Sequence, residues 1–262
     1  MTELDNAPTE LRETVILVGV LASLHRYPVK SMRGEDLTEA EIRFQGIRGD
    51  RRFAFIQGHD RSRFPWLTAR EVPRMLLYQA ALADPADPDN SPVLVTTPEG
   101  RQLDVFSDEL LDELRSQWRA PARNQPIYAV HLKSAHDAEP MSLVTTHALR
   151  RLSERLGEAV DARRFRENLV IDTDGAPCPD EQTWIGGRLV IGSGPGAVTL
   201  AVTRGDERCM MPNLHPDTAV QDGRILRTIT QQQDTIMGVY ATVAQQGTIH
   251  VGDPVYLIAA AR

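Results

Sequence analysis

Residues 198–218 read VTLAVTRGDERCMMPNLHPDT, and this stretch indicates how the chain folds. Its apolar start, Val198–Val202, is typical of a β-strand, and the polar, proline-broken residues that follow are typical of a loop. Cys209 lies at the head of that loop. A thiol at the end of an element can serve as a soft metal ligand or a nucleophile, whereas a cysteine inside an element is more often inert packing. The stretch therefore predicts a strand that ends just before Cys209, so that the thiol can act as a metal ligand or a nucleophile.

Similar strand-like runs, separated by clusters of Gly, Pro and Asp, extend outward from this stretch in both directions. They are Val15–Leu24, Leu37–Ile42, Arg52–Ile56, Val93–Thr96, Ile127–Leu132, Asn168–Asp172, Arg188–Gly192, Gly238–Val243 and Thr248–Ile258, the last broken at Gly252–Pro254. Two amphipathic helices are expected: Asp108–Trp118 after the N-cap Ser107, and Thr146–Leu156 before the C-cap Gly157. Many short strands with few helices predict a β-rich α+β chain built on barrels.

The 262 residues suffice for one large domain or two modest ones. Residues 1–13 are predicted to be a loose tail, and a linker is expected near 119–126. The net charge of −7 argues against general nucleic-acid binding, although a few convergent cations still allow an anionic small molecule. No apolar run approaches the ~20 residues of a membrane helix. Two cysteines and no secretion signal point to the cytoplasm.

Several polar clusters are candidates for ligand binding. In Arg163–Ile171, strand alternation would place Arg166 and Asn168 on one face, where a guanidinium and a carboxamide suit a planar ligand with a phosphate. Lys30 and Ser31 follow Pro28 at a strand end and offer an ammonium and a hydroxyl to a phosphate. Arg52, at another strand start, would point into a cleft. For each of these segments the alternative is an ordinary solvated surface.

Further candidates lie at helix and loop positions. Thr146 begins a helix, where free backbone N–H groups bind anions, or it is only part of a helix cap. His215 and Asp217 on the cysteine loop could handle protons, although such a pair is usually surface. Arg208 would favour the thiolate of Cys209, which Asp206 and Glu207 oppose. Cys178, between two prolines, is interpreted as an exposed bystander.

Six blocks in register give the chain a family resemblance. They are YPVKSMRG (27–34), DRRFAFI (50–56), TAREVPRM (68–75), RFRENLVID (164–172), RCMMPNLHPDT (208–218) and GTIHVGDPVYL (247–257). The chain resembles the MOSC family, and within it the amidoxime-reducing components. The resemblance implies an N-terminal MOSC β-barrel domain over 15–122, followed by a MOSC domain with a few peripheral helices over 123–260.

The resemblance also implies a molybdenum cofactor with Cys209 as the protein ligand to the metal. Asp217 would lie close to the metal, with His215 beside it as a further catalytic candidate. The other cofactor contacts would come from Lys30, Ser31, Arg52, Thr145, Thr146, Arg166, Asn168 and Arg208. The chain departs from the family pattern after the cysteine, where Pro212, Asn213 and His215 replace two hydroxyl residues and an Asp.

The expected function is a cytoplasmic molybdenum-cofactor oxidoreductase that reduces N-hydroxylated compounds. Since the sequence has neither ferredoxin cysteine spacing nor a GxGxxG fingerprint, electrons would come from a separate iron–sulfur or flavin partner. The first alternative is a non-redox carrier of sulfur or cofactor that uses Cys209. Pyridoxal phosphate chemistry is disfavoured, because a Schiff base needs a lysine and only Lys30 and Lys133 exist. The least specific alternative is a β-rich binding module in which Cys209 is buried packing.

Overall fold

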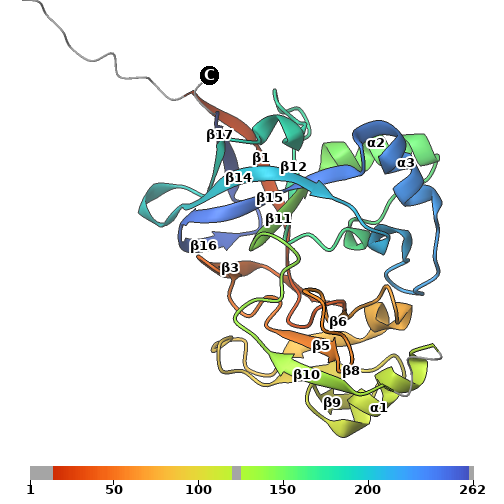
Figure 1. Ribbon diagram of the computed structural model, residues 1–262. Coiled ribbons are helices and arrows are strands. Elements are labelled where there is room, and N and C mark those ends of the chain that lie inside the picture. Colours follow the sequence, from red (N-terminus) through yellow and green to blue (C-terminus); the bar gives the residue numbers. More distant parts are fainter. Residues whose placement is uncertain (1–13, 120–124, 260–262) are drawn as a thin grey trace, which may run out of the picture.

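The computed structural model describes residues 14–119 and 125–259, so the predicted tail and most of the predicted linker lie outside the described residues. Seven strands of the main sheet close into a barrel, because the first and the seventh strand in its order also pair with each other. Around the barrel the order is β12 (Leu169–Asp172), β11 (Met141–Thr145), β15 (Ile236–Gln245), β14 (Val198–Glu207), β13 (Arg188–Ile191), β17 (Pro254–Ile258) and β1 (Val15–Arg26). Figure 1 shows this barrel in the upper part of the molecule.

Apolar side chains fill the barrel. Along β14, Val198, Leu200 and Val202 are buried while the two residues between them are half-buried, which is the period-two pattern of a strand with one face in a core. Bulges bend β1 near Gly19. A Cβ at Gly19 would lie 2.0 Å from the carbonyl oxygen of Asp172, so only glycine allows β1 to turn this corner of the barrel.

A second, smaller unit lies below the barrel (Figure 1) and has its own core around Phe55, Met75, Tyr78 and Leu110. Its strands form two three-stranded sheets: β10 (Ile127–His131), β5 (Phe53–Gln57) and β6 (Trp66–Leu67); and β7 (Gln79–Leu82), β8 (Val93–Thr96) and β9 (Gln102–Asp104). A further sheet joins β16 (Gly247–His250), β3 (Glu39–Arg43) and β4 (Gly46–Ile47). β2 (Glu35–Leu37) pairs antiparallel with the end of β1.

Three α-helices occur in the described ranges: α1 (Asp108–Gln117), α2 (Thr146–Leu156) and α3 (Arg224–Gln233). The predicted caps of the first two are confirmed: Ser107 accepts from the backbone of Leu110, and Gly157 ends α2 with φ of 74°. α2 and α3 pack together against the barrel on a third apolar cluster that includes Leu152 and Ile229. The predicted fold class, a β-rich α+β chain with few helices, is confirmed.

Some local predictions differ from the structure. The expected strand over 37–42 is interrupted at Thr38, and β14 continues to Glu207. The bounds 15–122 and 123–260 stay predictions; in the structure β1 belongs to the barrel and β10 pairs with β5 of the smaller unit. No described helix is long and apolar enough to cross a membrane.

Candidate active site

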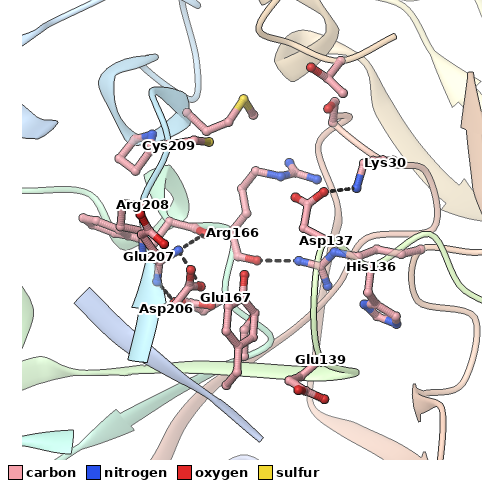
Figure 2. Close-up of a pocket in the computed structure, with 18 of the residues that line it drawn as sticks. Lys30, His136, Asp137, Glu139, Arg166, Glu167, Asp206, Glu207, Arg208 and Cys209 are labelled. Atoms are coloured by element: carbon pink, nitrogen blue, oxygen red, sulfur yellow. Dashed lines mark hydrogen bonds and ion pairs between the residues drawn. The ribbon is translucent and has the colours of Figure 1, made fainter. Parts of the chain in front are cut away.

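A cavity of about 290 Å³ lies where the barrel meets the smaller unit. Both units contribute to its wall, together with the loop that connects β10 to β11. Figure 2 shows Arg166 between Cys209 on one side and Lys30 with Asp137 on the other, with Glu167 and Asp206 lower in the view. The remaining lining residues are Ser31, Arg51, Phe64, Thr68, Arg70, His136, Glu139, Ser142, Phe165, Glu207, Arg208, Met211, Pro212 and Tyr240.

Cys209 lines this cavity and is exposed. β14 ends two residues earlier, at Glu207, and a short 3₁₀ turn over Met211–Asn213 follows. The thiol is therefore presented at a strand end, as predicted. Cys178 does not line the cavity and is half-buried against the barrel core, so the interpretation of Cys178 as exposed is wrong.

Arg208 anchors the chain immediately before Cys209. Its guanidinium is buried and donates to the carbonyl oxygens of Met237 and Phe165 at 2.6 and 3.2 Å. It also pairs with the carboxylates of Glu167 and Asp206, the latter at 3.0 Å. Because the contacts with Met237, Phe165 and Glu167 come from neighbouring segments, Arg208 fixes the backbone from which the thiol projects.

The buried acid Asp206 has an unusual environment. Burial raises the pKa of Asp206 to about 7, and nearby Glu167 adds to the shift while Arg208 opposes it. The side chain is also hydrogen-bonded to Tyr240, another lining residue. Asp206 therefore changes its protonation near neutral pH.

Lys30 supplies a buried cation from the opposite wall. Its ammonium donates to the carbonyl oxygen of Ala135 at 2.8 Å and to Asp137 at 2.6 Å. Burial lowers the pKa of Lys30, although Asp137 opposes the shift. Two of its three N–H donors are used, which leaves one for a ligand. Ser31, which follows it, lines the cavity with φ of 67°.

Arg166 lines the cavity, but not from a strand. It has φ of 58° and precedes β12, so the predicted strand alternation of Arg166 and Asn168 is wrong. Its guanidinium stacks on Tyr27 and donates to the carbonyl oxygen of Met32 at 2.7 Å. Burial lowers the pKa of Arg166 to about 10, with Arg51 contributing, so it stays charged at neutral pH. Among the described residues no carboxylate forms an ion pair with it.

Arg51, not Arg52, reaches the cavity from the smaller unit. Arg51 pairs with buried Asp50 and donates to the carbonyl oxygen of Arg166 at 2.8 Å. Arg52 instead contacts Leu132, His131 and Asp89 outside the cavity wall. Arg51 has φ of 47°, an uncommon backbone conformation that local sequence does not indicate, so the sequence cannot tell which of the two adjacent arginines reaches the cavity.

The other predicted cofactor contacts do not line this cavity. Thr145 is fully buried, caps α2 and donates to Glu181 at 2.6 Å. Thr146 donates to Asp172 at 3.0 Å. Asn168 is buried behind Arg51 and donates to Asp50 at 3.1 Å.

The predicted proton donors also lie away from the cavity wall. Asp217 is held by Arg33 at 2.7 Å and by both ends of the Arg163 guanidinium at 2.9 and 2.7 Å. His215 accepts a hydrogen bond from the backbone of Asp217 through Nδ1 at 3.1 Å. Asp217 therefore joins the cysteine loop to the smaller unit.

Two buried lining residues carry no signal in the sequence. Burial lowers the pKa of His136 to about 4, so the imidazole is neutral, and its Nε2 has no partner among the described residues. Glu167 is likewise buried, and its Oε2 has no such partner. Neither could be found from spacing, because only the tertiary fold brings them to the same cavity as Cys209.

Comparisons with known proteins agree with this architecture. The MOSC N-terminal beta barrel domain model matches residues 18–127, and the MOSC domain model matches residues 130–256. Mitochondrial amidoxime-reducing component 1 of Homo sapiens is 28% identical over an alignment of 311 residues that covers 96% of this chain and 86% of that protein. The Mus musculus protein of the same name is 26% identical, with 92% and 83% covered.

Among solved structures, the YUAD protein from Bacillus subtilis superposes with a TM-score of 0.50. It is 12% identical, and the match covers 95% of this chain and 99% of that one, so it shows a shared fold alone. The family models together span both the barrel and the smaller unit. The chain belongs to the MOSC-domain proteins, with a MOSC N-terminal β-barrel domain followed by a MOSC domain.

Proposed function

We propose that this protein is a molybdenum-cofactor oxidoreductase that reduces N-hydroxylated compounds, with Cys209 as the protein ligand to the metal. The observation that carries the proposal is an exposed thiol on the same cavity as two cations, Arg166 and, on the opposite wall, Lys30. MOSC domains are associated with this cofactor, and the relatives above are named for amidoxime reduction.

The residues present fit such a cofactor chemically. A thiolate suits a metal that already carries soft sulfur ligands. Arg166 is a buried guanidinium without a carboxylate partner among the described residues, which favours an anionic group such as a phosphate. Lys30 keeps one free donor beside it. Lys30, Ser31, Arg51 and Arg166 would hold the phosphate end, and Cys209 the metal.

When bound, the cofactor would supply two-electron redox chemistry at the nitrogen–oxygen bond of the substrate. The chain itself would orient the reacting groups. Arg208 would hold the backbone of Cys209 in place, and Asp206 would hold a proton on its carboxyl group near neutral pH. The proposal includes a cytoplasmic location and a separate iron–sulfur or flavin protein as electron donor.

The test is metal content and turnover of protein made in a host that synthesises the cofactor. The wild-type protein should contain close to one molybdenum per chain and reduce an aromatic amidoxime with a chemical reductant. Cys209→Ala should lose most of the molybdenum and the activity. Cys178→Ala, the matched control away from the cavity, should keep both.

An accessible thiol also suits a carrier that holds sulfur as a persulfide or passes the cofactor on. The two functions give different results with the same protein. Molybdenum-loaded protein that fails to reduce amidoximes or hydroxylamines with any reductant would exclude the oxidoreductase and favour the carrier.

A further inference from the structure

Glu207 is an acid without a partner on the wall of the cavity. It lines the cavity and is exposed, and no described residue forms a hydrogen bond or an ion pair with its carboxylate. The two lining acids nearest in the network are engaged, because Arg208 pairs with both Glu167 and Asp206. The carboxylate of Glu207 is therefore available to a ligand.

The carboxylate of Glu207 and the thiol of Cys209 lie on the same side of the chain. Burial alternates over these residues, with Glu207 and Cys209 exposed and Arg208 buried between them. The backbone N–H of Arg208 donates to the carbonyl oxygen of Thr235 at 2.8 Å, so strand pairing continues one residue beyond Glu207. In such an extended chain alternate side chains project to the same side, about 6.5–7 Å apart. A ligand that reaches the thiol therefore meets this carboxylate.

The chain after the thiol adds an apolar wall. Met211 and Pro212 line the cavity from the 3₁₀ turn that follows Cys209. Met211 also packs against the core of the smaller unit, which holds this turn in place. A ligand that matches both the carboxylate and this wall has an apolar body and a cationic group rich in N–H donors.

Glu139 is the other lining acid that has no partner among the described residues. It belongs to the loop between β10 and β11, and Figure 2 shows it at the lower end of the view, away from Cys209. Asp137 of the same loop is paired with Lys30. Glu207 is therefore the unpaired acid beside the thiol, and Glu139 offers a matched control.

We propose that Glu207 selects, among N-hydroxylated compounds, those whose reduced product is a cation: amidoximes and N-hydroxyguanidines that carry an apolar group. This selectivity rests on the proposed function. Reduction of an amidoxime takes two electrons from the electron donor and two protons, breaks the N–O bond, releases the oxygen as water and forms an N–H bond on the same nitrogen. The resulting amidine takes a further proton and becomes an amidinium, whose paired N–H groups a carboxylate accepts well. A hydroxamic acid gives a neutral amide, which Glu207 favours less.

Binding of two matched compounds to protein made in a host that synthesises the cofactor tests this without turnover. Benzamidine is an aromatic cation, and benzamide has the same shape without the charge. Wild-type protein should bind benzamidine more tightly by about fivefold, the size expected for an ion pair at a partly exposed site. The preference should disappear in Glu207→Gln. Glu139→Gln removes the same charge from the cavity wall away from the thiol and should keep the preference. Calorimetric titration measures both affinities.

Turnover gives a second readout. In Glu207→Gln the kcat/KM for benzamidoxime should fall about fivefold, while that for benzhydroxamic acid should stay close to wild type. A role of Glu207 in folding or in holding the cofactor would instead lower both values together, along with the molybdenum content.

Equal affinity of wild-type protein for benzamidine and benzamide would overturn the inference, and so would an unchanged preference in folded Glu207→Gln. Parallel loss of both activities and of molybdenum would also overturn it, because Glu207 would then hold the cofactor. If wild-type protein prefers benzamidine through Glu207 but reduces neither substrate, the redox function fails and the subsite for a cation remains.

Discussion

At the residue scale, Asp206 couples the stability of the protein to pH. Its pKa of about 7 in the fold lies above the ordinary value of 3.8, so folding favours the protonated acid. The unfolded chain releases this proton near pH 4 and the folded chain near pH 7. Stability therefore falls as the pH rises from about 4 to about 7 through this group.

Asp206→Asn should remove this dependence, because asparagine resembles the protonated acid. In cofactor-free protein, the melting temperature of the variant minus that of wild type should become larger as the pH rises from 5 to 8. Asp222→Asn is the control: Arg224 holds the pKa of Asp222 at about 2, so this difference should stay constant over the same range. A constant difference for Asp206→Asn would contradict the prediction.

At the element scale, Thr145 connects β11 to α2. Its hydroxyl accepts from the backbone of Ala148 at 3.1 Å and donates to buried Glu181 at 2.6 Å. Burial raises the pKa of Glu181, and the hydrogen bond from Thr145 opposes that shift. The structure therefore gives Thr145 a capping contact, and its predicted cofactor contact stays a prediction.

Thr145→Val should destabilise the protein by about 2 kcal/mol, since it removes a helix cap and a hydrogen bond to a buried acid. Thr145→Ser keeps the hydroxyl and should recover most of that loss. Chemical denaturation measures both. The molybdenum content of folded Thr145→Val should equal that of wild type, and a selective loss of metal would instead support the direct cofactor contact.

At the scale of the whole molecule, Asp217 forms an ion pair that links the barrel to the smaller unit. Arg33 of the smaller unit donates to Asp217 at 2.7 Å and to the carbonyl oxygen of Pro216 at 2.8 Å, while Arg163 binds the same carboxylate. These side chains are partly exposed, so the Arg33–Asp217 ion pair by itself contributes little to the free energy of unfolding. Arg163 binds both oxygens of the same carboxylate, and this shared network increases the contribution.

A double-mutant cycle of Arg33→Gln and Asp217→Asn should show a coupling of roughly 0.5–1 kcal/mol by chemical denaturation. In a Cys178→Ser background, iodoacetamide should alkylate Cys209 faster in either variant, because the loop that follows Cys209 is less restrained. If the stability changes of the two single variants add fully and the alkylation rate of Cys209 is unchanged, the Arg33–Asp217 ion pair does not restrain this loop.

Much of the fold follows from local patterns. Alternating apolar residues place the barrel strands, and Ser107 and Gly157 mark the helix ends, because capping and period-two burial act over a few residues. Helix α3 carries weaker signals: its N-cap is Gly223 without a side-chain bond, and Asp234 ends it in a left-handed conformation. Local patterns do not indicate that β1 belongs to the barrel formed by the second half.

The sequence by itself determined that a β-rich chain presents Cys209 at a strand end, and that Lys30, Ser31 and Arg166 are candidate ligand residues. Only the tertiary structure decided which cations meet that thiol. Arg51 lines the cavity while Arg52 does not, and the buried Oε2 of Glu167 has no partner among the described residues. The physical reason is that side-chain direction at positive φ, and burial between two units, depend on contacts more than a hundred residues apart in the chain.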